Sequence, residues 1–197
     1  NQFVRRQIKF CEAEIEAGDL VMIVKNNYHW LAATSQAGFL ANGEFAEIRR
    51  IANEEEIHGF RFADLTLQLI DYPEEPAFVA KAHLGTLYSS APSLTAQENR
   101  QLYDALSGEY RQVAENEKDL YKMLREDPYL NALQIKFAYA LTCHKAQGGQ
   151  WQAVLVDLGY VREDMLDTEF MRWLYTAITR SASELYLMNF PPDFFEQ

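Results

Sequence analysis

The chain has 197 residues, of which 48% are hydrophobic, and a formal net charge of −11 at pH 7. This composition can bury a core for one domain or two small ones, and it excludes a disordered tail. The acidic balance also excludes a surface built wholly for phosphate binding, because nonspecific nucleic-acid affinity comes from clustered lysine and arginine. Any contact with DNA is therefore expected to be local.

Hydropathy, cysteine and histidine set further limits. No apolar run approaches the roughly 18 residues of a membrane span, so we expect a soluble, cytoplasmic protein with no membrane partner. Cys11 and Cys143 are too few for a disulfide framework and are expected as reduced thiols. The histidines do not occur at zinc-site spacings, so no structural metal is predicted. The chain begins without methionine, inside a helical pattern, which favours a fragment of a longer protein.

A short helix and a strand come first in chain order. Apolar residues recur at steps of three and four from Phe3 to Ala17, which predicts an amphipathic helix that ends at Gly18. The β-branched apolar run Asp19–Lys25 predicts a strand, and the turn-forming residues Asn26 and Asn27 close it.

From Ala41 to Tyr88 the pattern changes to short alternating runs. These runs are Phe45–Ile51, Phe62–Leu69 and Phe78–Tyr88. Turn signals separate them at Asn42-Gly43, Asn53–Gly59 and Asp71-Tyr72-Pro73. The pattern predicts a small antiparallel barrel or meander.

A long helix and an α/β segment complete the chain. Thr95 and Glu98 have the spacing of a capping box, which predicts the start of a helix over Gln97–Glu126 that Asp127-Pro128 ends or bends. Beyond Asn131 the predicted elements are a buried strand at Ala153–Val156, a helix at Phe170–Thr179 and a strand at Glu184–Met188. This order predicts an α/β domain with a parallel sheet.

Two segments hold side chains suited to chemistry, and the first spans residues 139–151. Thr142, His144, Lys145 and Gln147 bring hydroxyl, imidazole, ammonium and amide groups to one short turn. The glycines at 148 and 149 let the backbone approach a ligand closely. Such a turn suits a sugar-phosphate chain or a nucleotide. On composition alone, a polar helix N-terminus followed by a glycine loop explains it equally well.

The second segment spans residues 173–182 and has Arg180 at the end of an apolar helix. A lone arginine at this position more commonly interacts with the last carbonyls of its own helix. A planar, permanently charged fork is also the group needed to stabilise charge on a transferring γ-phosphoryl group. Neither segment decides between these readings by itself.

Together, in this order and with an apolar strand between them, the two segments resemble the fifth and sixth motifs of superfamily 1 helicases. The residues that match the fifth motif are Thr142, His144, Lys145, Gln147 and Gly148. Those that match the sixth are Tyr175, Thr176, Ala177, Thr179 and Arg180. A third signature is similar to the RecD-like branch, which includes exodeoxyribonuclease V alpha subunits: Gly18-Asp19-Leu20-Val21-Met22, Asn26-Asn27-Tyr28 and Asn42-Gly43.

The resemblance implies an α/β, RecA-like motor domain with a parallel sheet, interrupted by an SH3-like β-barrel and a helix. The partial second motor domain would comprise residues 1–29 and 132–197, and the inserted barrel and helix residues 30–131. The helix at 97–126 is outside the family pattern, and we interpret it as packing that closes the insertion, with a lineage-specific arm as the alternative.

The resemblance also assigns roles. Arg180 would be the catalytic arginine finger. The implied nucleotide-binding residues are Gln147, Gly148, Gln150 and Arg180, although relatives often have an acidic residue where this chain has Gln150. The implied contacts to single-stranded DNA are Thr142, His144, Lys145 and Thr176. ATP and Mg²⁺ would be bound mainly by the first motor domain of the same chain, and nuclease or helicase subunits are further candidate partners.

The sequence contains no Gly-x-x-x-x-Gly-Lys-Ser/Thr and no Asp-Glu pair, the elements that cradle phosphates and bind magnesium in the first motor domain. We therefore expect half of an ATP-dependent DNA helicase that is inactive alone. Two other interpretations stay open: a stand-alone DNA- or protein-binding module derived from a helicase, and an acidic protein-interaction domain.

Overall fold

The computed structural model describes residues 1–162 and 165–195 and divides the chain into two compact units. The first unit is Asn1–Ala140 and the second is Leu141–Gln197, and each is described by itself. In the described residues no helix is long and apolar enough to cross a membrane, and no three His, Cys, Asp or Glu side chains gather as metal ligands.

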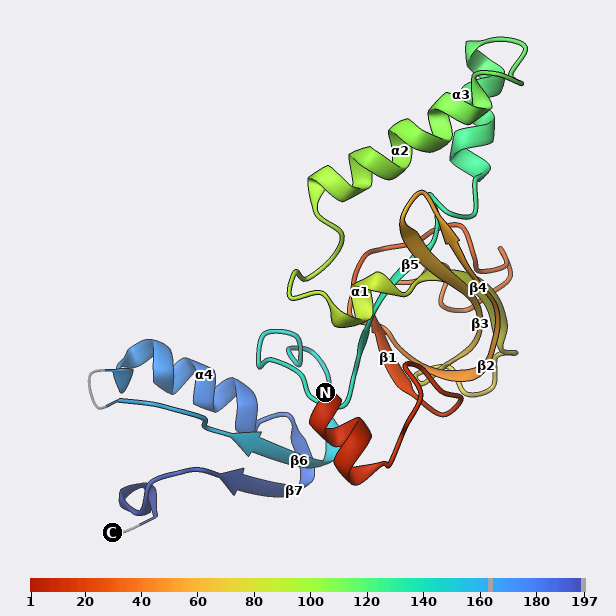
Figure 1. Ribbon diagram of the computed structural model, residues 1–197. Coiled ribbons are helices and arrows are strands. Elements are labelled where there is room, and N and C mark those ends of the chain that lie inside the picture. The colour runs from red at the N-terminus through yellow and green to blue at the C-terminus, as the bar shows by residue number, and fades with distance from the viewer. Residues whose placement is uncertain (163–164, 196–197) are drawn as a thin grey trace. The chain divides into compact units, whose positions relative to one another are not determined.

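The first unit is built around a closed five-stranded barrel (Figure 1). Its strands are β1 (Leu20–Ile23), β2 (Phe45–Ile57), β3 (Phe60–Leu69), β4 (Phe78–His83) and β5 (Leu133–Phe137). Neighbouring strands pair antiparallel except β4 and β5, which are parallel. The mixed α/β class and the barrel predicted from the alternating runs are confirmed.

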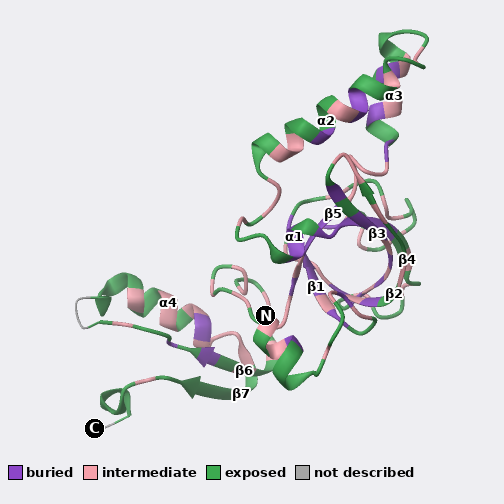
Figure 2. Ribbon diagram, viewed as in Figure 1, coloured by how far each residue is buried: buried purple, intermediate pink, exposed green. Residues whose placement is uncertain are grey.

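Alternation along β3 shows how the sequence builds the barrel core. Ala63, Leu65, Leu67 and Leu69 are buried, whereas the residues between them are partly exposed. Since successive side chains on a strand point to opposite faces, one face of β3 fills the interior. Figure 2 shows buried residues along the barrel strands. The core continues across the other strands with Val21, Ile23, Ile48 and Ile135.

Two features of the barrel differ from the prediction. The expected turn at Asn53–Gly59 is wrong over most of its length, because β2 continues to Ile57 with register shifts and the turn is formed by His58 and Gly59. Both residues have positive φ, 54° and 79°, as two-residue hairpin turns with the sheet's own twist require. The run Phe78–Tyr88 is also not one strand, since α1 (Gly85–Tyr88) follows β4.

The predicted helix Gln97–Glu126 is two helices, α2 (Ala96–Tyr110) and α3 (Glu117–Glu126). The capping box of Thr95 and Glu98 is confirmed. The break arises because Asn116 is extended and its side chain accepts the N–H of Asp119, which starts a new helix. Leu102, Leu106, Leu120 and Leu124 then pack with Phe60 and Phe62, so this helical pair is packed on the barrel.

The predicted helix Phe3–Ala17 is wrong. One turn of π-helix, Val4–Ile8, is present, and Phe10 has a positive φ of 57°. The chain turns back because buried Arg5 binds the carbonyl oxygens of Ala13 and Glu14. Beyond this segment, β1 and β5 are barrel strands, so the barrel extends on both sides of the range 30–131 predicted for the insertion.

The second unit is a β-α-β arrangement. β6 (Trp151–Asp157) and β7 (Ser181–Met188) pair in parallel, with α4 (Thr168–Ile178) between them in sequence and a 3₁₀ turn at Pro192–Phe194 after β7. The parallel pairing and the helix agree with the prediction. The strand Ala153–Val156 is not buried as predicted: Leu155 is 59% exposed, and of these four residues only Val156 is buried. Parallel strands are ordinarily covered on both faces, and these two are not.

Candidate nucleotide and nucleic-acid interface

The loop before β6 holds the first predicted segment as a compact turn. The carbonyl oxygen of Thr142 accepts the backbone N–H groups of Lys145 and Ala146, so the polar side chains project from one tight bend. Thr142 and His144 are exposed, and Lys145 is half-buried. The exposed groups include a hydroxyl and an imidazole, both of which can donate to a phosphate oxygen.

Positions 148 and 149 of the loop require glycine for different structural reasons. Gly148 has a φ of +92°, which side chains other than glycine rarely adopt. At Gly149 the reason is space, because a Cβ atom would lie 2.4 Å from the Trp151 ring. The loop therefore turns sharply at 148 and lies flat against the indole at 149.

A pocket of about 760 Å³ brings the two predicted segments together. His144 and Gln147 line it from the loop, and Thr176 lines it from α4. Thr142, Lys145, Gly148, Gln150 and Arg180 do not line it. The predicted DNA-binding and nucleotide-binding residues thus divide into a group that shares this pocket and a group that lies on the surrounding loop and helix end.

Arg180 connects the end of α4 with the loop. Its Nε donates to the carbonyl oxygen of Thr176 at 3.0 Å, and its Nη1 donates to the carbonyl oxygen of Gly149 at 3.1 Å. Its Nη2 donates to the Thr179 hydroxyl at 3.1 Å. The side chain is half-buried, and both terminal nitrogens have a further N–H group beyond these bonds. The guanidinium group is therefore held in place by these bonds, and it retains N–H groups that can donate to an anion.

The hydroxyl groups of Thr176, on α4, and Thr179, at its C-cap, bond to the backbone of the helix. Thr176 Oγ1 donates to the carbonyl oxygen of Arg172, and Thr179 Oγ1 donates to that of Tyr175. Each oxygen still has lone pairs, so Thr176 can accept a hydrogen bond from a ligand in the pocket. Asp167 caps the start of α4 by accepting the N–H of Phe170.

Gln147, Gly148 and Gln150, the predicted nucleotide-binding residues of the loop, are all exposed. Gln147 lies in the pocket with His144, whereas Gln150 lies one residue before β6 and outside it. Their amide groups can contact a ribose or a base from the surface of the loop.

Cys143 and Trp173 are pocket residues that sequence reasoning missed. Cys143 Sγ donates to the carbonyl oxygen of Trp173 at 3.4 Å, and burial raises the pKa of the thiol. Trp173 stacks on Phe170, with ring centroids 5.8 Å apart. The signal was present in the sequence, since Cys143 lies between two motif residues and Trp173 lies three residues before Thr176, one turn along the helix.

Comparison with known proteins finds a helicase domain that is similar to the C-terminal part of this chain. Residues 137–188 match the UvrD-like helicase C-terminal domain, a range that contains β6, α4, β7 and both segments. A relative, uncharacterized protein R530 of Acanthamoeba polyphaga mimivirus, is 33% identical over 70 residues. Those residues are 36% of this chain and 14% of the viral protein, so the chain spans a small part of that relative. The match supports a superfamily 1 helicase C-terminal domain at residues 137–188.

Proposed function

We propose that the chain is the C-terminal part of a RecD-like, ATP-dependent DNA helicase that translocates on single-stranded DNA. In this proposal it supplies the arginine finger, Arg180, and part of the DNA grip. The observation that carries it is the match of residues 137–188 to a helicase domain in which His144 and Thr176, from separate motifs, line one pocket.

The DNA grip is proposed at the loop and the adjoining part of the pocket. Thr142 and His144 are exposed donors, Lys145 adds a positive charge next to them, and Thr176 faces the same pocket as His144. A sugar-phosphate strand is bound by hydrogen-bond donors and positive charges that follow its backbone. A short row of such groups is enough for a local contact, so the proposed grip is compatible with the negative net charge of the chain.

The nucleotide side of the proposal rests on Arg180, Gln147, Gly148 and Gln150. The guanidinium is held by three acceptors and keeps donors on both terminal nitrogens, so it fits one side of a triphosphate. ATP would supply the reactive γ-phosphoryl group, and Mg²⁺ would be held mainly by another motor domain of the same protein. This chain's role is to hold the fork where negative charge develops.

The RecD-like assignment is supported by how the signature segments meet on the barrel. Asn26 Oδ1 accepts the backbone N–H of Asn42 at 2.8 Å, and the N–H of Gly43 binds the carbonyl oxygen of Ile23. Asp19 is buried at the start of β1. The signature segments are therefore connected to one another by hydrogen bonds. We propose that the barrel and the helical pair are an insertion in the second motor domain.

A second candidate, a non-catalytic binding module, is favoured by one observation. The three contacts of Arg180 include the carbonyl of Thr176 in its own helix, which is the bonding expected of a helix-end arginine without catalytic function. Under this reading the DNA grip is retained and the finger is structural.

The experiment that tests the proposal measures binding of a fluorescent oligothymidylate to the chain by anisotropy at low salt. Replacing both Thr142 and His144 by alanine is expected to weaken binding about three- to tenfold, the effect of losing hydrogen bonds at an interface. Thr168→Ala, an exposed threonine at the start of α4, is the control and should bind normally. Equal affinities for all three proteins would contradict the proposed grip.

A further inference from the structure

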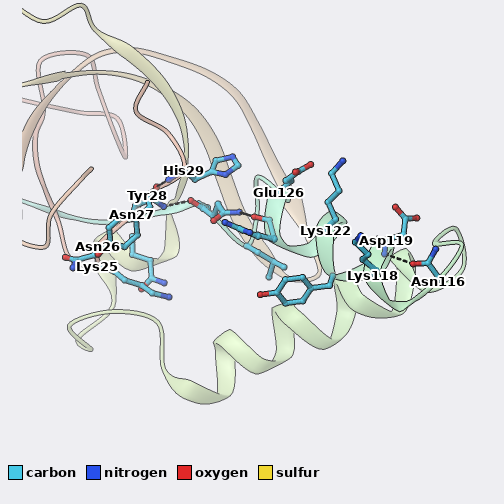
Figure 3. Close-up of a pocket in the computed structure, with 16 residues that line it drawn as sticks. Lys25, Asn26, Asn27, Tyr28, His29, Asn116, Lys118, Asp119, Lys122 and Glu126 are labelled. Carbon is cyan, nitrogen blue, oxygen red and sulfur yellow. Dashed lines mark hydrogen bonds between the residues drawn. The ribbon is translucent and has the colours of Figure 1, made fainter. Parts of the chain in front are cut away.

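An open groove of about 920 Å³ lies on the first unit, between the loop that follows β1 and the helix α3. Figure 3 shows the loop residues Lys25 to His29 on one side, and Asn116 with α3 residues up to Glu126 on the other. Every residue that lines it belongs to Asn1–Ala140, so the groove is separate from the pocket of the second unit.

The groove collects positive charge on a strongly acidic chain. Four exposed basic residues line it, namely Lys25, Lys118, Lys122 and Arg125. In the part of the chain that the structure describes, none of the four forms an ion pair. The two acidic lining residues are Asp119 and Glu126, and the Asp119 carboxylate accepts the N–H of Glu115. The groove is thus a local exception to the net charge of −11.

Two exposed tyrosines flank these charges. Tyr28 is 73% exposed and stacks by one face on Phe39, with ring centroids 4.8 Å apart. Tyr121 is 68% exposed on α3, next to Lys122. An exposed ring beside unpaired cations is the combination that single-stranded nucleic acids use, since every base has a face that can stack and every nucleotide has a phosphate.

Hydrogen bonds hold the wall of the groove in place. The carbonyl oxygen of Asn131 accepts both Asn27 Nδ2 at 2.8 Å and Trp30 Nε1 at 2.7 Å. The Asn131 side chain in turn donates to the carbonyl oxygens of Arg125 and Asp127. The loop after β1 is therefore fastened to the C-terminal end of α3, and ligand binding would require little ordering of the backbone.

We propose that this groove binds the backbone of single-stranded DNA, with phosphates at Lys25, Lys118, Lys122 and Arg125 and bases stacked on Tyr28 and Tyr121. An acidic peptide would use the charges, but it would leave the two exposed rings unused. The site goes beyond the grip proposed at Thr142 and His144, because it lies in the other unit and uses none of the same residues.

The test uses the whole chain, an oligothymidylate of about 12 nucleotides and anisotropy over a range of salt concentrations. Lys118→Glu with Lys122→Glu is expected to weaken binding about tenfold and to reduce the salt slope by about 0.7 for each phosphate that the variant no longer neutralises. The matched control, Arg50→Glu with Arg100→Glu, makes the same charge change at exposed positions outside the groove. Tyr121→Ala should weaken binding about fivefold with an unchanged salt slope, because stacking releases no counterions.

The outcomes separate the two sites. If the control weakens binding as much as the groove variant, or if polyglutamate competes as well as the oligonucleotide, the groove proposal is overturned. If the groove variants bind normally while Thr142→Ala with His144→Ala loses binding, the groove proposal fails and the proposed grip stands. If the groove variants alone lose binding, the groove is supported and the proposed grip fails.

Discussion

Arg5 and Asp19 form a bidentate ion pair from which solvent is excluded. Arg5 Nε and Nη2 lie 2.7 Å from the two carboxylate oxygens of Asp19, and both side chains have 0% exposure. The Tyr139 hydroxyl donates to the same carboxylate at 2.7 Å. Burial and this bond raise the pKa of Tyr139 to about 12. The pair fastens the N-terminal segment to the residue before β1, and the Tyr139 hydroxyl fastens the segment after β5 to the same carboxylate.

Replacing Arg5 by methionine should destabilise the barrel by about 3–5 kcal/mol, because Asp19 would be left as an unpaired buried charge. Hydrogen exchange of the β1 and β5 amides is the suitable measurement, since it reports on the first unit alone. Arg61→Met is the control: Arg61 pairs with Glu14 at 2.7 Å, but its side chain is 46% exposed. A surface pair contributes at most about 1 kcal/mol. Equal loss of protection in both variants would contradict the prediction.

His83 should make the stability of the first unit depend on pH. It is 4% exposed between Phe60 and Phe62, neither ring nitrogen has a hydrogen-bond partner, and burial lowers its pKa from 6.5. Below pH 6.5 the unfolded chain therefore binds a proton that the folded chain resists. The free energy of unfolding should decrease as pH falls from this value toward the lowered pKa of the folded state, by at most about 1.4 kcal/mol per pH unit.

His83→Leu removes both unpartnered nitrogens and the titrating group. The variant should be at least as stable as the parent at neutral pH, and it should lose the pH dependence between about 6.5 and 5. His29→Gln, an exposed histidine, serves as the control and should keep the dependence. The difference is measured by urea unfolding at several pH values in this range, with hydrogen exchange of the β3 amides as the readout for the first unit. An unchanged pH profile in His83→Leu would show that another group is responsible.

Gly149→Ala should disturb the loop between the two motifs. The added methyl would lie 2.4 Å from the Trp151 ring, so either the indole or the loop must move, at a cost of about 1–3 kcal/mol. Exchange of the β6 amides should accelerate, and the contact of Arg180 with the Gly149 carbonyl should weaken. Gly108 lies in α2, where an added Cβ atom would meet nothing within 4 Å, so Gly108→Ala is expected to be neutral or stabilising. Normal exchange in Gly149→Ala would contradict the predicted clash.

The barrel could be predicted where side chains alternate, and not where a tertiary contact outweighs local preference. Burial along β3 alternates from Ala63 to Leu69, and the pattern predicted this strand closely. The N-terminal segment has a helical pattern, but Arg5 is drawn to Asp19 and to the carbonyls of Ala13 and Glu14, and this bonding replaces the helix. The break before α3 depends on the cap at Asn116, a polar residue that the apolar periodicity of Gln97–Glu126 does not register.

The candidate site residues were predicted from motif order, and their arrangement in space was not. His144 and Thr176 are 32 positions apart in the numbering, and only the folded unit places them in one pocket. Cys143 lies between two motif residues, but its bond to the backbone carbonyl of Trp173 could not be predicted, because a backbone acceptor depends on the fold and not on residue type. The groove along α3 escaped prediction for a similar reason, since Lys25 and Lys122 belong to different predicted elements.

Arg180→Lys separates the two readings of the arginine because they predict effects of very different size. As a helix-end cation, Arg180 would contribute about 0.3–1 kcal/mol to stability, and lysine would largely replace it. As an arginine finger it would act on the rate, and its loss costs about 10³ to 10⁵ in kcat in related phosphoryl-transfer systems. Lysine cannot rescue that role, because an ammonium lacks the planar fork that Arg180 presents beside Gly149.

The measurement is single-turnover hydrolysis by the full-length protein with saturating ATP and DNA. We expect Arg180→Lys to fold, to bind ATP and to hydrolyse it at least about a hundredfold more slowly, a cautious limit below the usual range. Arg100→Lys, an exposed arginine on α2, is the matched control and should hydrolyse normally. A near-normal rate in Arg180→Lys would contradict the finger, because the bonds to Thr176, Thr179 and Gly149 would then be the whole function of the side chain.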